Sequence, residues 1–316
     1  MLMDAREKLP HHFSEIGGGD APPAPPPQQS AWDVLRALPV PQSSSQPAEE
    51  PLRDGGGIVR FSVGQITTFR KCRREYLLRY VHRLQPPPGT ASTRRSPASE
   101  AGTAVHALLE TADFNATEKE FRLAAERGAA THLASLDKTT QKEAKSAVVN
   151  LYGRDIFAKL RSEGLRSFGK EIPFTLGGAR KGGEYLLTGK MDALAYTRAG
   201  NIYVIDYKFA EKPPLEELAE AMMQPRLYAL AAARSLPATG EITCALIYLR
   251  GKDAATEERL VTRDELESIE AELAADSEKI AAFEGNGGLM PEWPTVSELC
   301  PGRRCGFYRF CFPAGR

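Results

Sequence analysis

The stretch EYLLTGKMDALAYTRAGNIYVIDYKF, residues 184–209, decides the fold. Two segments rich in Leu, Tyr, Ile and Val flank the turn signal RAGN, so the stretch predicts an antiparallel pair of strands. The second strand ends in an acid and a base, Asp206 and Lys208, whose side chains share a face because strand residues alternate. Such a pair belongs either to a solvated edge strand or to an active site.

A second acid, Asp192, lies on the first strand of this pair. Pairing of the strands would bring Asp192 and Asp206 to one part of the sheet, where two carboxylates repel each other unless a cation lies between them. Carboxylate oxygens suit Mg²⁺ or Mn²⁺. Lys208 could stabilise charge on a phosphate or orient an attacking water.

Helical and strand patterns alternate along the rest of the chain. A further strand is predicted over 169–176 and another over 242–250, on the basis of apolar and β-branched residues. Apolar periodicity predicts helices over 62–81, 101–112, two or three within 116–163, one over 214–235 and one over 263–283. This order predicts an α/β fold with a mixed central β-sheet flanked by helices, including a helical insertion.

Composition separates two parts of the 316-residue chain. Residues 1–57 are rich in Pro, Gly, Ser and Gln and predict a disordered N-terminal segment and linker, whereas 58–316 form the folded domain. The formal net charge is zero, which neither favours nor excludes a nucleic-acid partner. No apolar run is long enough for a membrane helix and the N-terminus has no signal-peptide core, so a cytoplasmic location is expected.

Two polar positions on predicted helices have alternative interpretations. His106 lies beside an apolar stripe, where a lone histidine is usually structural but can also be a metal ligand, and Gly102 one turn earlier would permit close backbone approach. Gln224 and Tyr228 are four residues apart and therefore share a helical face. They form either plain helix surface or a polar pair that faces the active site.

Four short motifs together resemble the RecB-like branch of the PD-(D/E)XK nucleases. GxxxH spans Gly102–His106, GKMD spans Gly189–Asp192, DYK spans Asp206–Lys208 and QxxxY spans Gln224–Tyr228. Each motif is weak alone, but they occur in the family's order over about residues 60–313. The resemblance implies a restriction-endonuclease-like core and a DNA nuclease that depends on Mg²⁺ or Mn²⁺ and acts as an exonuclease.

The resemblance also implies roles for individual residues. His106, Asp192, Asp206 and the carbonyl of Tyr207 would bind the metal, and Lys208 would be the catalytic lysine. Gln224 and Tyr228 would form the accessory motif of the active site. Glu171 matches an acidic position often found on the preceding strand.

Four cysteines frame the nuclease-like region. Cys72 precedes it, and Cys300, Cys305 and Cys311 follow it. This arrangement resembles the AddB-type and CRISPR-adaptation iron–sulfur nucleases, and implies a [4Fe–4S] cluster joining the two ends of the domain. Four thiolates equally satisfy a structural zinc. The spacing departs from the family's usual C-x2-C-x5-C pattern, which puts Cys300 in doubt, and Cys244 reads as a buried apolar residue.

Two classes of function therefore remain. The first is a metal-dependent deoxyribonuclease that works in DNA repair or recombination with a partner helicase or as a piece of a helicase fusion. The second is an iron–sulfur DNA-binding module whose catalysis has lapsed. The retention of His106, both acids and Lys208 favours the enzyme. Arginines and lysines between Arg70 and Arg83, interspersed with aromatic residues, predict a surface that follows phosphates.

Overall fold

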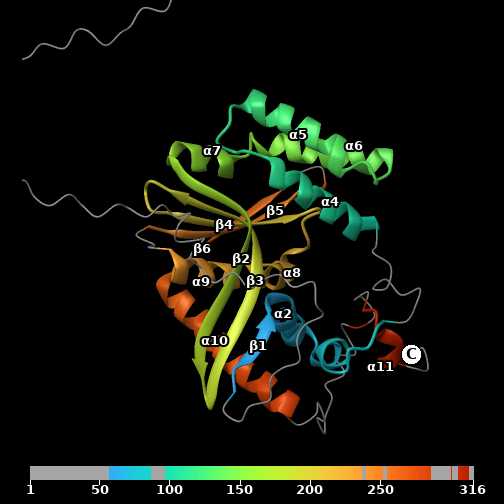
Figure 1. Ribbon diagram of the computed structural model, residues 1–316, viewed down its shortest axis with the longest axis vertical. Coiled ribbons are helices and arrows are strands. Elements are labelled where there is room, and N and C mark those ends of the chain that lie inside the picture. The colour runs from blue at the N-terminus through green and yellow to red at the C-terminus, as the bar shows by residue number, and fades with distance from the viewer. Residues whose placement is uncertain are drawn as a thin grey trace, which may run out of the picture.

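The computed structural model describes residues 57–86, 97–236, 240–251, 255–285, 300 and 305–312. Six strands form one mixed sheet in the order β1-β3-β4-β5-β6, with β2 paired to the other edge of β3. Their bounds are β1 Val59–Ser62, β2 Leu165–Arg180, β3 Gly183–Thr197, β4 Ile202–Lys208, β5 Ile242–Tyr248 and β6 Thr256–Val261. The predicted α/β fold with a mixed sheet is confirmed (Figure 1).

Along one of its edges, strand β3 pairs first with β1 and then, from its midpoint on, with β4. Its first half runs parallel to β1 through Tyr185–Thr188, and its second half runs antiparallel to β4 through Ala193–Tyr196. Strand β2 pairs antiparallel with both halves. Residues 189–192, the GKMD motif, lie between the two segments of β3 that pair with β1 and β4.

Strand β4 lies in the interior of the sheet. It pairs antiparallel with β3 and parallel with β5, and Ile202 to Tyr207 are all buried. A parallel strand covered on both faces is expected to be apolar throughout. The edge-strand interpretation of Asp206 and Lys208 is therefore wrong, because Asp206 is only 1% exposed and its strand pairs with β3 along one edge and with β5 along the other.

Helices cover both faces of the sheet (Figure 1). One face packs against α4 (Pro97–Thr111), α5 (Glu118–His132), α6 (Lys138–Leu151) and α7 (Asp155–Ser162). The other face packs against α2 (Val63–Lys71), α9 (Met223–Ser235) and α10 (Arg263–Gly285). The short α8 (Leu215–Ala221) precedes α9, so the helix predicted over 214–235 is divided at Met222. The sheet is thus held between two apolar cores.

The helix predicted over 62–81 is interrupted at Cys72. Helix α2 begins with the expected capping box between Ser62 and Gln65, and ends where Cys72 adopts an extended backbone. The Cys72 sulfur then accepts a hydrogen bond from the backbone N–H of Glu75 and caps α3 (Arg73–Tyr76), which continues into the π-helix η1 (Leu77–Val81). The apolar period continues through this break, so periodicity alone did not reveal it.

Candidate active site

Side chains of β2 and β3 switch from one face of the sheet to the other at two acids that lie opposite each other, Glu171 on β2 and Asp192 on β3. Phe168 of β2 packs toward α4–α7, but Ile172, four residues later, packs toward α9 and α10. Positions four apart on a regular strand face the same side. The change occurs at Glu171, whose φ of 50° lies in the left-handed region that non-glycine residues rarely occupy.

Strand β3 changes face at the same level. Met191 packs toward α9 and α10, while Ala193 packs toward α4–α7, and the register of β2 with β3 continues on both sides without an inserted residue. Glu171 and Asp192 therefore meet across the two strands at this break. Backbone outliers of this kind cluster at functional sites, where the surrounding structure holds them.

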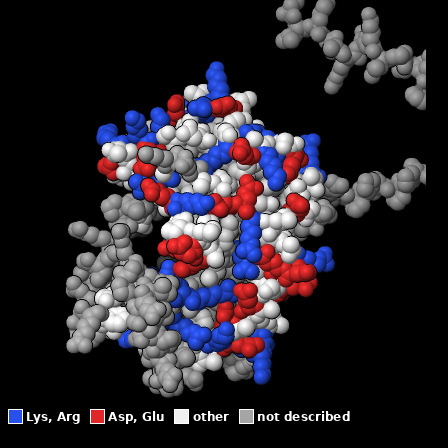
Figure 2. All heavy atoms as spheres, turned by 180° about the vertical axis from the view of Figure 1, so that it is seen from behind, with Lys and Arg blue, Asp and Glu red and all other residues white. Residues whose placement is uncertain are grey.

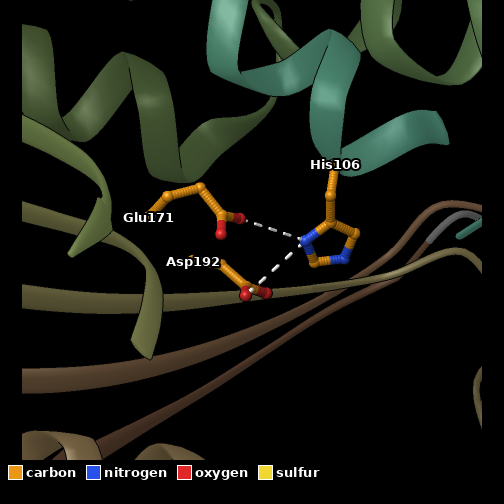
Figure 3. Close-up of side chains that lie close together, drawn as sticks. All are labelled: His106, Glu171 and Asp192. Atoms are coloured by element: carbon orange, nitrogen blue, oxygen red, sulfur yellow. Dashed lines mark ion pairs between the residues drawn. The ribbon is translucent and has the colours of Figure 1, made fainter. Parts of the chain in front are cut away.

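Helix α4 supplies the third member of the group. Its buried side, which includes Val105 and Leu108, packs on the sheet and directs His106 toward the two acids. His106 Nδ1 lies 3.6 Å from Glu171 Oε1 and 3.6 Å from Asp192 Oδ1 (Figure 3). Among the described residues, His106, Glu171 and Asp192 form the one group of His, Cys, Asp and Glu side chains placed to hold a metal ion.

The other ring nitrogen of His106 meets the backbone of β4. His106 Nε2 lies 3.1 Å from the carbonyl oxygen of Tyr207, and the N–H of Tyr207 donates to Asp192 Oδ2 at 2.9 Å. A proton on Nε2 would donate to that carbonyl and leave the Nδ1 lone pair facing the acids. Metal-binding histidines are commonly held in this way. The backbone N–H and C=O of Tyr207 thus position Asp192 and the histidine, respectively.

Asp206 lies beside this group rather than within it. Neither of its carboxylate oxygens accepts a hydrogen bond of good geometry, although Oδ2 has the Lys208 ammonium 2.6 Å away. A buried carboxylate with so few partners is unfavourable unless positive charge is near. The acids, the imidazole and the neighbouring carbonyl are also the donors that Mg²⁺ and Mn²⁺ accept, so the residues present fit a divalent cation.

Helix α9 orients the lysine, since Lys208 Nζ donates to Gln224 Oε1 at 3.4 Å and Gln224 Nε2 donates to Tyr228 Oη at 2.5 Å. The ring of Phe174 packs edge-on against Tyr228. The predicted Gln224–Tyr228 pair is therefore brought to Lys208. A side chain on Gly189 would collide with Phe174 and Val63, which explains a glycine at the start of GKMD.

Electrostatics at the site favour a bound cation. Burial, followed by the nearby Asp206, raises the pKa of Asp192 from 3.8 to about 6, and burial also raises the pKa of Asp206 against the lowering effect of Lys208. Because the pKa values of both acids lie above the ordinary value, each acid tends to keep its proton at mildly acidic pH. A cation that binds to the two carboxylates must displace these protons. Metal binding is therefore expected to weaken as the pH falls below about 6.

Lys170 is a site-lining residue that the sequence motifs missed. Its ammonium donates to the carbonyls of Glu110 and Ala112 at the C-terminal end of α4, so it joins the helix that carries His106 to the strand that carries Glu171. Lysines suit the unpaired carbonyls of a helix end. By contrast, among the described residues no atom outside the backbone of α4 lies within 4 Å of a Cβ built on Gly102, so the expected close approach at that glycine is not seen there.

The cysteines form no comparable metal-holding group among the described residues. The two ends of the domain nevertheless meet near Cys72. Arg74 Nη2 lies 3.5 Å from the carbonyl of Phe310 in the segment that contains α11 (Tyr308–Cys311), and the Arg79 guanidinium lies over the ring of Phe307. Burial raises the pKa of the Cys305 thiol, and the nearby Cys72 and Cys311 raise it further.

Three of the six basic side chains from Arg70 to Arg83 form ion pairs with acids. Arg70 pairs with Asp276, Lys71 pairs with Glu220, and Arg79 pairs with Glu75. Figure 2 shows basic and acidic side chains interspersed over the face that it presents. The basic residues Arg303 and Arg304 lie outside the described residues, as do residues 1–56. In the part that the structure describes, no helix is long and apolar enough to cross a membrane.

An imidazole, two acids and an oriented lysine thus meet at the break of a mixed sheet, and the imidazole and acids are placed to hold a divalent cation. The chain belongs to the PD-(D/E)XK nuclease superfamily, whose family model matches residues 60–312. Its mixed sheet flanked by helices is the restriction-endonuclease-like fold of such nucleases.

Solved structures also resemble the chain. One, from Eubacterium rectale and described provisionally as an exonuclease, is 15% identical, with 77% of this chain and 88% of that chain covered and a TM-score of 0.47. Another, the protein SSO0001, is 16% identical, with 63% of this chain and 98% of that chain covered and a TM-score of 0.32. No curated protein matches the chain.

Proposed function

We propose that the protein is a metal-dependent deoxyribonuclease that hydrolyses phosphodiester bonds from DNA ends. The observation that carries the proposal is the meeting of His106, Glu171 and Asp192 next to the ion pair of the buried Asp206 with the partly exposed Lys208. When bound there, Mg²⁺ or Mn²⁺ would supply Lewis-acid stabilisation of the phosphate and a more acidic water. His106, Glu171, Asp192 and Asp206 would hold the ion, with the second lone pair of the Tyr207 carbonyl available to it.

The chain's own groups perform the remaining work. The Lys208 ammonium presents its charge to the developing negative charge on a phosphate oxygen. Gln224, supported by Tyr228, limits the positions of that ammonium. The Tyr207 carbonyl accepts a hydrogen bond from His106 Nε2, so that Nδ1 carries a free lone pair that can bind the ion.

The proposal is tested by incubating the purified full chain with end-labelled linear DNA and with circular DNA. We expect linear DNA to be degraded in Mg²⁺ or Mn²⁺, no degradation in EDTA, and resistance of the circles. His106→Ala should lose at least about a hundred-fold in rate, while the matched His132→Ala, on helix α5 and outside the metal-holding group, should keep full activity. Binding of DNA without cleavage in any metal would instead favour a DNA-binding module whose catalysis has lapsed.

We further propose that Cys72, Cys300, Cys305 and Cys311 hold a [4Fe–4S] cluster, as in RecB-like and AddB-type iron–sulfur nucleases. Contacts of Arg74 and Arg79 with the C-terminal segment, which bring the two ends of the domain together, support this proposal. The hydrogen bond that the Cys72 sulfur accepts from a backbone N–H also supports it, because such bonds commonly help to set the reduction potential of a cluster.

Iron and acid-labile sulfide are the quantities that test the cluster. Protein purified without oxygen should contain both, and Cys72→Ser should lose them, while Cys244→Ala, at a buried core position, should retain them. A wild-type protein that contains one zinc and no sulfide would refute the cluster.

A helicase partner, or a fused helicase, is proposed to supply the motor in DNA repair or recombination in the cytoplasm. The chain contains no G-x-x-x-x-G-K-[ST] sequence, so energy from ATP by that route must come from another polypeptide segment. Cross-linking of the chain in an extract of its own cells tests this proposal. If the proteins cross-linked to the chain included no P-loop ATPase, that result would count against the proposal.

A further inference from the structure

Lys190 occupies the gap between the two neighbours of β3. It follows the segment paired with β1, which ends at Thr188, and precedes the segment paired with β4, which begins at Ala193. Its ammonium forms an ion pair with Glu171, and its side chain is 59% exposed, compared with 17% for Glu171. We propose that Lys190 holds the place of the metal ion on Glu171 and, once displaced by the ion, binds a phosphate of the DNA backbone.

The two carboxylate oxygens of Glu171 have separate partners. Oε1 faces His106 Nδ1 at 3.6 Å, and Oε2 is held by Lys190. A divalent cation entering between His106, Glu171 and Asp192 places two positive charges beside an ammonium that already neutralises one of the ligands. Like charges so close repel each other, so binding of the ion weakens the hold of Glu171 on Lys190.

The other lysines at the site lack this freedom. Lys208 is held between Asp206 and Gln224, and Lys170 is held by the carbonyls that end α4. Lys190 has a long flexible stem and an exposed ammonium two residues from Asp192. When one phosphate of a DNA strand lies at the ion, the adjacent phosphate of that strand lies near the rim of the site. An ammonium released there is placed to bind that adjacent phosphate.

This inference rests on the proposed function and predicts two effects of opposite sign. In Lys190→Met, Mn²⁺ titrated without DNA should bind about three-fold more tightly, because the competing charge is gone and an exposed ion pair contributes little. Binding of single-stranded DNA, measured in Ca²⁺ over a range of salt, should weaken. The slope of log affinity against log salt should fall by about 0.7, the value for one phosphate contact.

Controls separate this role from a structural one. Lys145→Met removes a similarly exposed lysine that faces Glu126 between α5 and α6, and should change neither measurement. Lys190→Arg should keep the salt slope of the wild type. Weakening of both metal and DNA binding in Lys190→Met, or no change in either, overturns the inference while the proposed function stands. A wild type that binds no divalent cation overturns both.

Discussion

Replacing Asp192 by asparagine is expected to remove nuclease activity and, at pH 8, to make the protein more stable than the wild type. The loss of activity should reach at least about a thousand-fold, because a bound metal contributes several kcal/mol to the transition state. The asparagine oxygen can still accept the hydrogen bond that Tyr207 donates to Asp192. The fold should therefore be retained.

The gain in stability follows from the raised pKa of Asp192. Because that pKa is about 6 in the folded protein and 3.8 ordinarily, the folded state binds the proton more tightly, and its stability falls as the pH rises from about 4 to 6. Above pH 6 the ionised wild type carries the full penalty, about 3 kcal/mol, which asparagine lacks. Thermal unfolding in EDTA should give the variant a higher unfolding temperature than the wild type at pH 8, and this difference should shrink toward pH 4.

A matched acid gives the control for this prediction. Asp264→Asn changes an exposed residue in the first turn of α10, and should alter the unfolding free energy by less than about 0.5 kcal/mol at either pH. An Asp192→Asn protein that is less stable than the wild type at pH 8 would contradict the raised pKa of Asp192.

Replacing Lys208 by methionine is expected to lower the cleavage rate by about a hundred- to a thousand-fold, the effect of losing one charge-stabilising donor. It should also destabilise the protein at pH 8, because Asp206 is 1% exposed and loses the ammonium 2.6 Å away. Since the Lys208 side chain is 34% exposed, we expect about 2 kcal/mol rather than the larger loss typical of fully buried pairs. Activity assays and urea unfolding measure the two effects.

The double variant Asp206→Asn/Lys208→Met separates these causes. It removes the unpaired charge as well as the ammonium, and should recover most of the stability at pH 8 without recovering activity. If the double variant were no more stable than Lys208→Met alone, the instability would arise from lost packing of the lysine stem instead.

The centre of the sheet was predictable because its signals are local. Apolar strands around the RAGN turn fixed the pairing of β3 with β4, which brings Asp192 to the backbone of Tyr207. The stripe on α4 predicted the side of the helix on which His106 lies. Strands β1 and β6 were missed because β1 has only four residues and β6, TEERLV, carries charges where an apolar alternation would be expected.

Features that depend on contacts between distant segments could not be predicted in the same way. The ion pair of Lys190 with Glu171 and the anchoring of Lys170 on α4 exist only because β2, β3 and α4 meet. Alternation along β2 and β3 assumed an unbroken pleat, but both strands change face at Glu171 and Asp192. Glu171, matched only faintly in sequence, consequently emerged as a central member of the group.

The left-handed backbone of Glu171 has an evolutionary consequence. A non-glycine residue in that conformation costs the fold about 1 kcal/mol, which glycine would recover. Replacement by glycine, which relaxes the backbone at this position, therefore also deletes an acid from the proposed site, so this gain in stability and loss of the proposed cleavage come together. In the proposed nuclease, selection for cleavage would keep the glutamate at this position despite its backbone cost.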